Sequence, residues 1–276
     1  MKKTIFLLLT ISTTALVYVS CSSGSDEIVN QTDTTALGAS VAIDATTEMD
    51  IKTGLYVTAP SNPTTKIADA GPENCSTIIV TQPNGTEYPK VFNVDFGTTG
   101  CVSNQLTRKG KLKITLSGPV ITTGSKMTIE RIDYSINGIK LEGTIEYTNT
   151  TTVPTTPQWT RKVTNGKFTD LKGRVYLNSG TLTVKQTAGV DTPYVLDDNV
   201  YEMPDGTHTV TTDNGGSLTL TVKETLIKKY SCEFISKGQL KVVGGFLNGV
   251  VDYGNNACDS NYTYTHESGV GYNLSM

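Results

Sequence analysis

The stretch TIERIDYSINGIKLEGTIEY, residues Thr128–Tyr147, decides the fold class. Two runs of alternating apolar and polar residues flank Asn137-Gly138, a pair suited to the positive φ angles of a type I′ turn. That register gives the cross-strand pairs Ile136/Ile139, Tyr134/Leu141 and Ile132/Gly143 on one face, with Ser135/Lys140 and Asp133/Glu142 on the other. The stretch therefore predicts a β-hairpin with one apolar face and one hydrated face.

Short runs rich in Val, Ile, Thr and Tyr continue from residue 75 to the end of the chain, separated by Gly, Asn and Asp. This pattern is typical of antiparallel β-structure, and about a dozen strands are expected. Further hairpin turns are predicted at Asn165-Gly166, Asn178-Ser179-Gly180 and Gly215-Gly216, with bends or bulges at Gly238, Gly244-Gly245 and Gly249. We expect one all-β domain over residues 46–276, an antiparallel meander forming a sandwich or an open barrel.

A pattern C-x18-VD[F/Y]G-x3-C-x-SN occurs twice, over residues 75–104 and 232–261. Each copy places two cysteines 26 positions apart, Cys75 with Cys101 and Cys232 with Cys258. Four cysteines allow three pairings, and the matched spacing favours one disulfide within each repeat. Each bridge would stabilise the fold by roughly 3 kcal/mol. A zinc site is disfavoured because the chain has no C-x2-C pair and only two histidines.

Asp95 and Asp252 occupy the same place in the two repeats, at predicted strand ends before the turn glycines Gly97 and Gly254. Two interpretations are open. Each carboxylate could accept hydrogen bonds from turn amides, or help to bind a cation or ligand. The structural role is favoured, because neither segment supplies the dense oxygen ligands of a calcium loop.

The N-terminus has the features of a lipoprotein signal peptide. Lys2 and Lys3 precede an apolar stretch, Ile5–Val19, that is too short and too interrupted for a good membrane span and is followed by Ser20-Cys21. We expect residues 1–20 to be removed and Cys21 to carry a lipid. The chain is then exported, and an oxidising compartment favours disulfides.

Residues 21–45 are rich in Ser, Thr, Asp and Gly, and they predict a disordered, flexible tether. The stretch from Ala36 to Ala59 has apolar residues at a loosely helical spacing, which allows one short helix. Removal of residues 1–20 leaves 21 basic and 26 acidic residues, a formal charge of −5. No basic stripe is present, so a nucleic-acid partner is not expected.

Residues for catalysis are not evident. The chain has no G-x-S-x-G elbow and no spare cysteine, and His208 and His266 are expected to be exposed surface residues. We therefore expect no catalytic residue, no metal and no cofactor. Tyr262, Tyr264 and His266 would share one strand face, which makes them a weak candidate for a ligand face; sheet packing is the favoured alternative.

Several motifs in order resemble a family of uncharacterised lipoproteins and secreted proteins from Bacteroidota. They are VDFG-x3-C, Arg108-Lys109-Gly110-Lys111, Tyr134 with Asn137-Gly138, Glu142-Gly143-Thr144, Asp197-Asp198 and VDYG-x3-CD. The resemblance covers nearly the whole mature length and implies an all-β extracytoplasmic domain. It brings no activity and no catalytic residues.

Two functions are consistent with these observations. The favoured one is a binding protein for a glycan or another extracellular ligand, anchored to the outer membrane by its N-terminal lipid and displayed on the cell surface. The second is a periplasm-facing structural or assembly component that contacts envelope proteins. An exposed aromatic patch would favour the first, and an apolar sheet edge suited to β-augmentation would favour the second.

Overall fold

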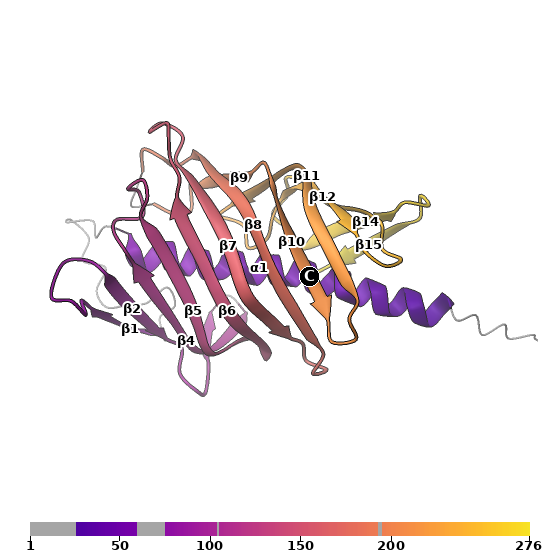
Figure 1. The fold of residues 1–276 in the computed structure, drawn as a ribbon, viewed down its shortest axis with the longest axis horizontal. Coiled ribbons are helices and arrows are strands. Elements are labelled where there is room, and N and C mark those ends of the chain that lie inside the picture. Colours follow the sequence, from indigo (N-terminus) through magenta and orange to yellow (C-terminus); the bar gives the residue numbers. More distant parts are fainter. Residues whose placement is uncertain (1–25, 60–74, 104, 193–194) are drawn as a thin grey trace, which may run out of the picture.

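The computed structural model describes residues 26–59, 75–103, 105–192 and 195–276, with side chains except those of residues 26–34. This part of the chain forms one helix and one antiparallel sheet of 15 strands (Figure 1). The elements are α1 (Asp26–Thr58), β1 (Thr77–Thr81), β2 (Lys90–Asp95), β3 (Cys101–Ser103), β4 (Leu106–Leu116), β5 (Lys126–Ile136), β6 (Ile139–Asn149), β7 (Gln158–Thr169), β8 (Val175–Ala188), β9 (Val200–Met203), β10 (Gly206–Thr212), β11 (Ser217–Lys229), β12 (Lys237–Val243), β13 (Gly249–Asn255), β14 (Asn261–His266) and β15 (Gly271–Ser275).

The sheet is a nearly sequential meander, in the order β1-β2-β4-β5-β6-β7-β8-β10-β11-β12-β13-β14-β15. The short strand β3 pairs with β4, and β9 pairs with β8 and β11. The expected all-β antiparallel meander is therefore confirmed. The sheet has two open ends, because β1 and β15 each pair with one other strand of the described chain.

Helix α1 crosses the concave face of the sheet and belongs to the hydrophobic core (Figure 1). Leu37, Val41 and Ile51 are buried in it, and Gly54 lies so close to β5 that a Cβ there would be 2.8 Å from the sulfur of Met127. The prediction of a flexible tether over residues 21–45 is therefore wrong for residues 35–45, which are helical and packed in the core. Residues 21–25, Cys21 and the signal peptide lie outside the described residues.

The tether prediction failed for a physical reason. Composition rules treat Ser, Thr and Asp as residues that favour solvent, but here the sheet supplies basic partners for the helix acids. The hydroxyls of Ser40 and Thr46 donate to carbonyl oxygens one turn back in the helix itself. The small side chains of Ala36, Ala39 and Ser40 let the helix approach the sheet closely, and all three are buried. No helix in the described ranges combines the length and the apolar character needed to cross a membrane.

A line of bulges creases the sheet across β4 to β7. Asp133 and Asn165 have φ angles of 48° and 50°, and Gly110 and Gly143 have φ angles of 81° and 101°. A Cβ on Gly110 would lie 2.2 Å from the carbonyl oxygen of Asp133, so neighbouring strands touch along this line. Bulges of this kind increase the local twist and let a sheet curl.

The crease corrects three sequence predictions. Asn165-Gly166 and Asn178-Ser179-Gly180 do not form hairpin turns, because they lie inside β7 and β8. The Asn137-Gly138 hairpin has the predicted pairs next to the turn, but a register shift between Glu130 and Tyr134 leaves Ile132 43% exposed rather than facing Gly143. The turn at Gly215-Gly216 is confirmed between β10 and β11.

Replacement of Gly143 tests the crease. Gly143→Ala should lower the free energy of unfolding by about 2 kcal/mol or more, because a side chain is strained at this φ angle and its Cβ would lie 2.6 Å from the Asn165 carbonyl oxygen. Gly173→Ala is the control, because Gly173 has a φ angle of 81° with no neighbouring atom within 4 Å of a Cβ. Urea unfolding measures both, and equal losses would contradict a close approach of strands at the crease.

Candidate functional site

The charged side chains buried in the core meet where α1 crosses the sheet, and we call this group the polar seam. The helix contributes Asp44, Glu48, Asp50 and Thr53, and the sheet contributes Arg108, Arg131, Tyr134, Arg161 and His208. Three carboxylates thus meet three guanidinium groups. The numbers of opposite charges match, so that attraction between them offsets part of the cost of removing each charge from water.

Arg161 on β7 lies between two acids on successive turns of the helix. Its Nη2 is 3.2 Å from Oδ1 of Asp44, its Nη1 donates a short hydrogen bond to Oε1 of Glu48, and its side chain is 2% exposed. Burial disfavours the charge on Arg161, but the carboxylates of Glu48 and Asp44 outweigh this effect, and the pKa of Arg161 lies above its ordinary value. The guanidinium therefore stays charged in the core.

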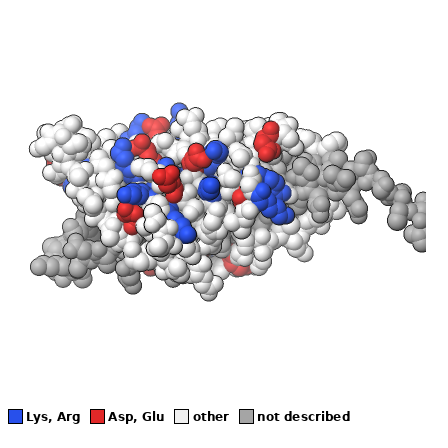
Figure 2. Space-filling model, turned by 90° about the horizontal axis from the view of Figure 1, so that it is seen from below, with Lys and Arg blue, Asp and Glu red and all other residues white. Residues whose placement is uncertain are grey.

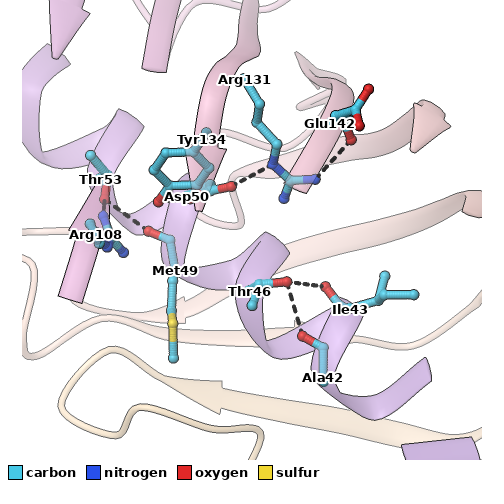
Figure 3. Close-up of polar contacts among 10 residues, drawn as sticks. All are labelled: Ala42, Ile43, Thr46, Met49, Asp50, Thr53, Arg108, Arg131, Tyr134 and Glu142. Carbon is cyan, nitrogen blue, oxygen red and sulfur yellow. Dashed lines mark hydrogen bonds and ion pairs between the residues drawn. The ribbon is translucent and has the colours of Figure 1, made fainter. Parts of the chain in front are cut away.

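Asp50 forms the second centre of the seam (Figure 3). Its carboxylate accepts hydrogen bonds from Nε of Arg131 at 2.7 Å and from the hydroxyl of Tyr134 at 2.8 Å. One turn further, Arg108 donates to Thr53 Oγ1 at 2.7 Å. Burial, together with the charge of Asp50, raises the pKa of Tyr134 well above its ordinary value, so this hydroxyl remains a donor.

His208 on β10 is buried, 6% exposed, so the prediction of a surface histidine is wrong. Its Nε2 lies 3.5 Å from Oδ2 of Asp44. Burial disfavours the charged form of the ring and lowers the pKa of His208 below its ordinary value. The charge of Arg161 lowers this pKa further, and the carboxylate of Asp44 raises it in part. The reason for the error is register. His208 alternates with the outward Thr207 and Thr209 and therefore points toward the helix.

The seam is suited to fixing the helix in place. Each of its acids is within ion-pair distance of a base, and the seam residues are buried beneath the sheet. A general base or a nucleophile needs access to a substrate, and this arrangement offers the acids no such contact. We therefore interpret the polar seam as the device that sets the register of α1 against the sheet.

Lys228 on β11 is a further buried cation, which lies outside the polar seam. Its amino group donates to the carbonyl oxygen of Cys232, and its side chain is 2% exposed. Burial lowers the pKa of Lys228 from an ordinary value of 10.5 to about 8, although Glu48 and Glu233 oppose this effect. The buried amine is therefore still charged at pH 7 and loses its proton above about pH 8, whereas in the unfolded chain it remains charged up to about pH 10.5.

We expect Lys228→Met to stabilise the protein at pH 7, by on the order of 2 kcal/mol, because the cost of burying the charge exceeds one hydrogen bond. The wild-type penalty is complete below pH 8 and is relieved as the pH rises toward 10.5, since over this range the folded state has released a proton that the unfolded state still binds. The advantage of the variant should therefore shrink over this range. Urea unfolding at several pH values measures it, and an advantage independent of pH would contradict the assignment.

The weak candidate ligand face is corrected by the structure. Tyr262 and Tyr264 are 5% and 2% exposed, so they face the core rather than a ligand. This agrees with the favoured alternative, in which these rings pack against the sheet. His266 shares their strand face but lies at the end of β14, where its Nε2 is 2.9 Å from the Phe246 carbonyl oxygen. Trp159 is also buried and stacks on Tyr147.

The repeated motifs have the structural role that was favoured. Disulfides join Cys75 to Cys101 and Cys232 to Cys258, as the spacing predicted. Asp95 and Asp252 each accept a hydrogen bond from the amide two residues on, at 2.9 Å and 2.7 Å. These caps are therefore confirmed. The hydrogen bond from Lys111, and then the amide of Gly97, lower the pKa of Asp95.

The β1 edge, defined here as Thr77–Thr81, is the surface of the sheet that most resembles a binding site. Its sequence TIIVT carries no charge and no proline, and Ile79 and Val80 are 62% and 50% exposed. Natural proteins usually protect an edge strand with lysine, proline or a covering segment. The disulfide at Cys75 holds the start of this strand to β3.

The outer face of the sheet is different from the β1 edge. It carries exposed ion pairs between neighbouring strands, including Lys113–Glu130, Lys126–Glu146 and Lys167–Glu142. Figure 2 shows acidic and basic side chains interspersed on the surface seen there. Exposed pairs of this kind contribute little stability and keep a face hydrated.

Comparisons of the chain with protein-family models, with curated proteins and with solved structures found no match. The resemblance to Bacteroidota lipoproteins therefore remains an expectation from the sequence motifs. Within the described residues, no group of three or more His, Cys, Asp or Glu side chains is arranged to hold a metal ion.

Sequence reasoning missed the polar seam entirely. The signal that could have revealed it is the spacing of Asp44, Glu48 and Asp50 among apolar residues of the 36–59 stretch, together with isolated arginines in strands. Arg131 and Arg161 lie in strand-like sequence, where alternation alone allows a polar residue to face solvent. Their partners lie 81 and 113 residues away in the chain, so local patterns could not connect them.

Proposed function

We propose that the protein is an exported, lipid-anchored component of the outer membrane that acts by binding, and that it captures an extended segment of another envelope protein along the β1 edge. This is the structural or assembly role of the two functions considered. The observation that carries it is an uncharged, exposed strand at the end of a 15-stranded sheet. A partner strand would extend the antiparallel ladder there.

The inward side of β1 supports the proposal. Val80 pairs with Phe92 and points to the same side of the sheet as this core residue, yet it is half exposed because the core ends there. An added strand with an apolar residue at each alternate position would cover Ile78 and Val80 and continue the core. The Cys75–Cys101 disulfide holds the edge in one geometry, which lowers the entropy cost of docking.

The glycan-binding alternative has less support. Sugar platforms use exposed aromatic rings, whereas the described aromatic residues of the sheet are mostly in the core. Tyr272 and Phe246 are exposed, but they lie on the last strand, β15, and on the β12–β13 turn.

Site-specific photocrosslinking in intact cells tests the proposal. A benzophenone amino acid at Ile79 should give a discrete adduct, and mass spectrometry should place the crosslink in an extended apolar segment of the partner. The same amino acid at Leu171, which is 74% exposed on the β7–β8 turn, is the control. Val80→Lys should abolish the adduct, because a buried lysine would oppose docking. Equal adducts at both positions, or none at Ile79, would reject docking at the β1 edge.

Protease treatment of intact and lysed cells, with a known periplasmic protein as control, tests the location. Protection until lysis is expected for the periplasm-facing role proposed here. Digestion on intact cells would instead place the domain on the cell surface and return the search to extracellular ligands.

A further inference from the structure

The two ends of α1 lie at opposite ends of the sheet. Gly38 is beside β14, where a Cβ would be 3.9 Å from the hydroxyl of Tyr262, whereas Thr53 and Gly54 contact β4 and β5. Figure 1 shows the N-terminal end of α1 extending beyond the sheet on the side of β14 and β15. The β1 edge lies at the other end (Figure 1).

Two turns at the β14–β15 end are joined to each other. His266 Nε2 donates to the Phe246 carbonyl oxygen at 2.9 Å, and the amide of Glu267 donates to the Asn248 carbonyl oxygen at 2.8 Å. Because Nε2 carries the proton, Nδ1 of His266 is free to accept a hydrogen bond from the Ser268 amide at 3.1 Å. The histidine predicted as part of a ligand face thus fixes the positions of the turns 244–248 and 267–270.

These turns and the start of β15 carry three exposed apolar side chains, which we call the tip patch. Phe246 is 69% exposed, Val270 is 51% exposed and Tyr272, stacked on Tyr264, is 41% exposed. Glu267 is the one charged residue in the two turns, which contain no lysine or arginine. A positively or negatively charged partner would therefore find few opposite charges on these turns.

The tip patch lies near the anchor. Asp26, where α1 begins, is five residues after Cys21, and five residues span at most about 17 Å. The ten helical residues from Asp26 to the buried Ala36 add about 15 Å. A lipid on Cys21 would thus keep the β14–β15 end within about 30 Å of the bilayer, at an effective concentration on the order of millimolar.

We propose that the tip patch contacts the lipid bilayer, with Phe246, Val270 and Tyr272 entering the interfacial region. This inference rests on the proposed lipid anchor. Aromatic side chains favour the membrane–water interface, and a weak contact is sufficient once the anchor supplies proximity. The contact fixes the orientation of the body, so that the β1 edge points away from the membrane toward envelope partners.

Depth-dependent quenching tests the contact. In Phe246→Trp the introduced indole should lose about half of its emission on phosphatidylcholine vesicles with brominated acyl chains, relative to unbrominated vesicles, because interfacial side chains reach the acyl boundary. Ile121→Trp is the control, since Ile121 is 73% exposed on the β4–β5 turn. Trp159, 3% exposed, contributes the same background to both variants.

The experiment is made with two tethers. The first is the chain purified from membranes, whose flotation with vesicles reports the native anchor. The second replaces residues 1–21 with a hexahistidine segment bound to nickel-chelating lipids. Quenching of Phe246→Trp but not of Ile121→Trp, with either tether, supports the contact.

Equal emission from Phe246→Trp on brominated and unbrominated vesicles, with the chain bound to them, would overturn the inference and leave the anchor intact. Failure of the purified chain to float would contradict the proposed anchor, while the nickel-tethered chain would still decide whether the tip patch enters lipid. The two failures are therefore distinguishable.

Discussion

Arg161→Met is expected to lower the free energy of unfolding by roughly 3–5 kcal/mol. The substitution leaves Asp44 and Glu48 buried without the cation that both contact, and burial of an unpaired carboxylate is costly. Urea unfolding followed by far-UV circular dichroism measures the change.

Lys162→Met is the matched control for this variant. Lys162 is the next residue of β7 and is exposed on the outer face, so its loss should change stability by less than about 0.5 kcal/mol. Replacing Asp44 and Glu48 with leucine in the Arg161→Met background should recover most of the stability, because apolar side chains can substitute for a complete buried ion-pair group. Similar effects of Arg161→Met and Lys162→Met would contradict the role given to the polar seam.

The second large effect is expected from the disulfides. The double substitution Cys232→Ser with Cys258→Ser should lower the free energy of unfolding by roughly 3 kcal/mol. The bridge joins residues 26 positions apart, and its removal gives the unfolded chain more conformational freedom. Cys75→Ser with Cys101→Ser should cost a similar amount, since its sequence separation is the same. Urea unfolding of each variant, compared with the wild type under oxidising and reducing conditions, measures both.

Reduction of the wild type provides a control for the cysteine substitutions. Reduction of the wild type should lower its stability to that of the variant lacking all four cysteines, and reduction should leave that variant unchanged. A wild type whose unfolding midpoint does not respond to reductant would contradict the two bridges. Peptide mapping with thiol labelling would then show which pairing, if any, is present.

The sequence allowed prediction of those features that depend on local pattern. The Asn137-Gly138 turn was predictable because the required positive φ angles select these two residues, and they have φ angles of 50° and 84°. The disulfide pairing was predictable because the two repeats have equal spacing. The roles of Asp95 and Asp252 followed from turn chemistry within three residues.

Features that depend on distant partners could not be predicted. Asn165-Gly166 has the composition of a hairpin turn, but it lies within β7 because the neighbouring strands continue past it and absorb the bend as a bulge. The helix was assigned to a tether because its polar residues find their partners on strands more than 50 residues away. Burial of His208 and Tyr262 likewise depends on a helix that covers their strand face.

The most direct test of this account is hydrogen exchange of the amides of α1 from Ala36 to Leu55 in the mature chain. If the helix is a core element held by the polar seam, these amides should be protected to a degree comparable with those of β5 and β7, since exchange would require opening of the core. Exchange of the 36–55 amides within seconds, while the sheet remains protected, would show that the segment is a tether after all and would contradict the account.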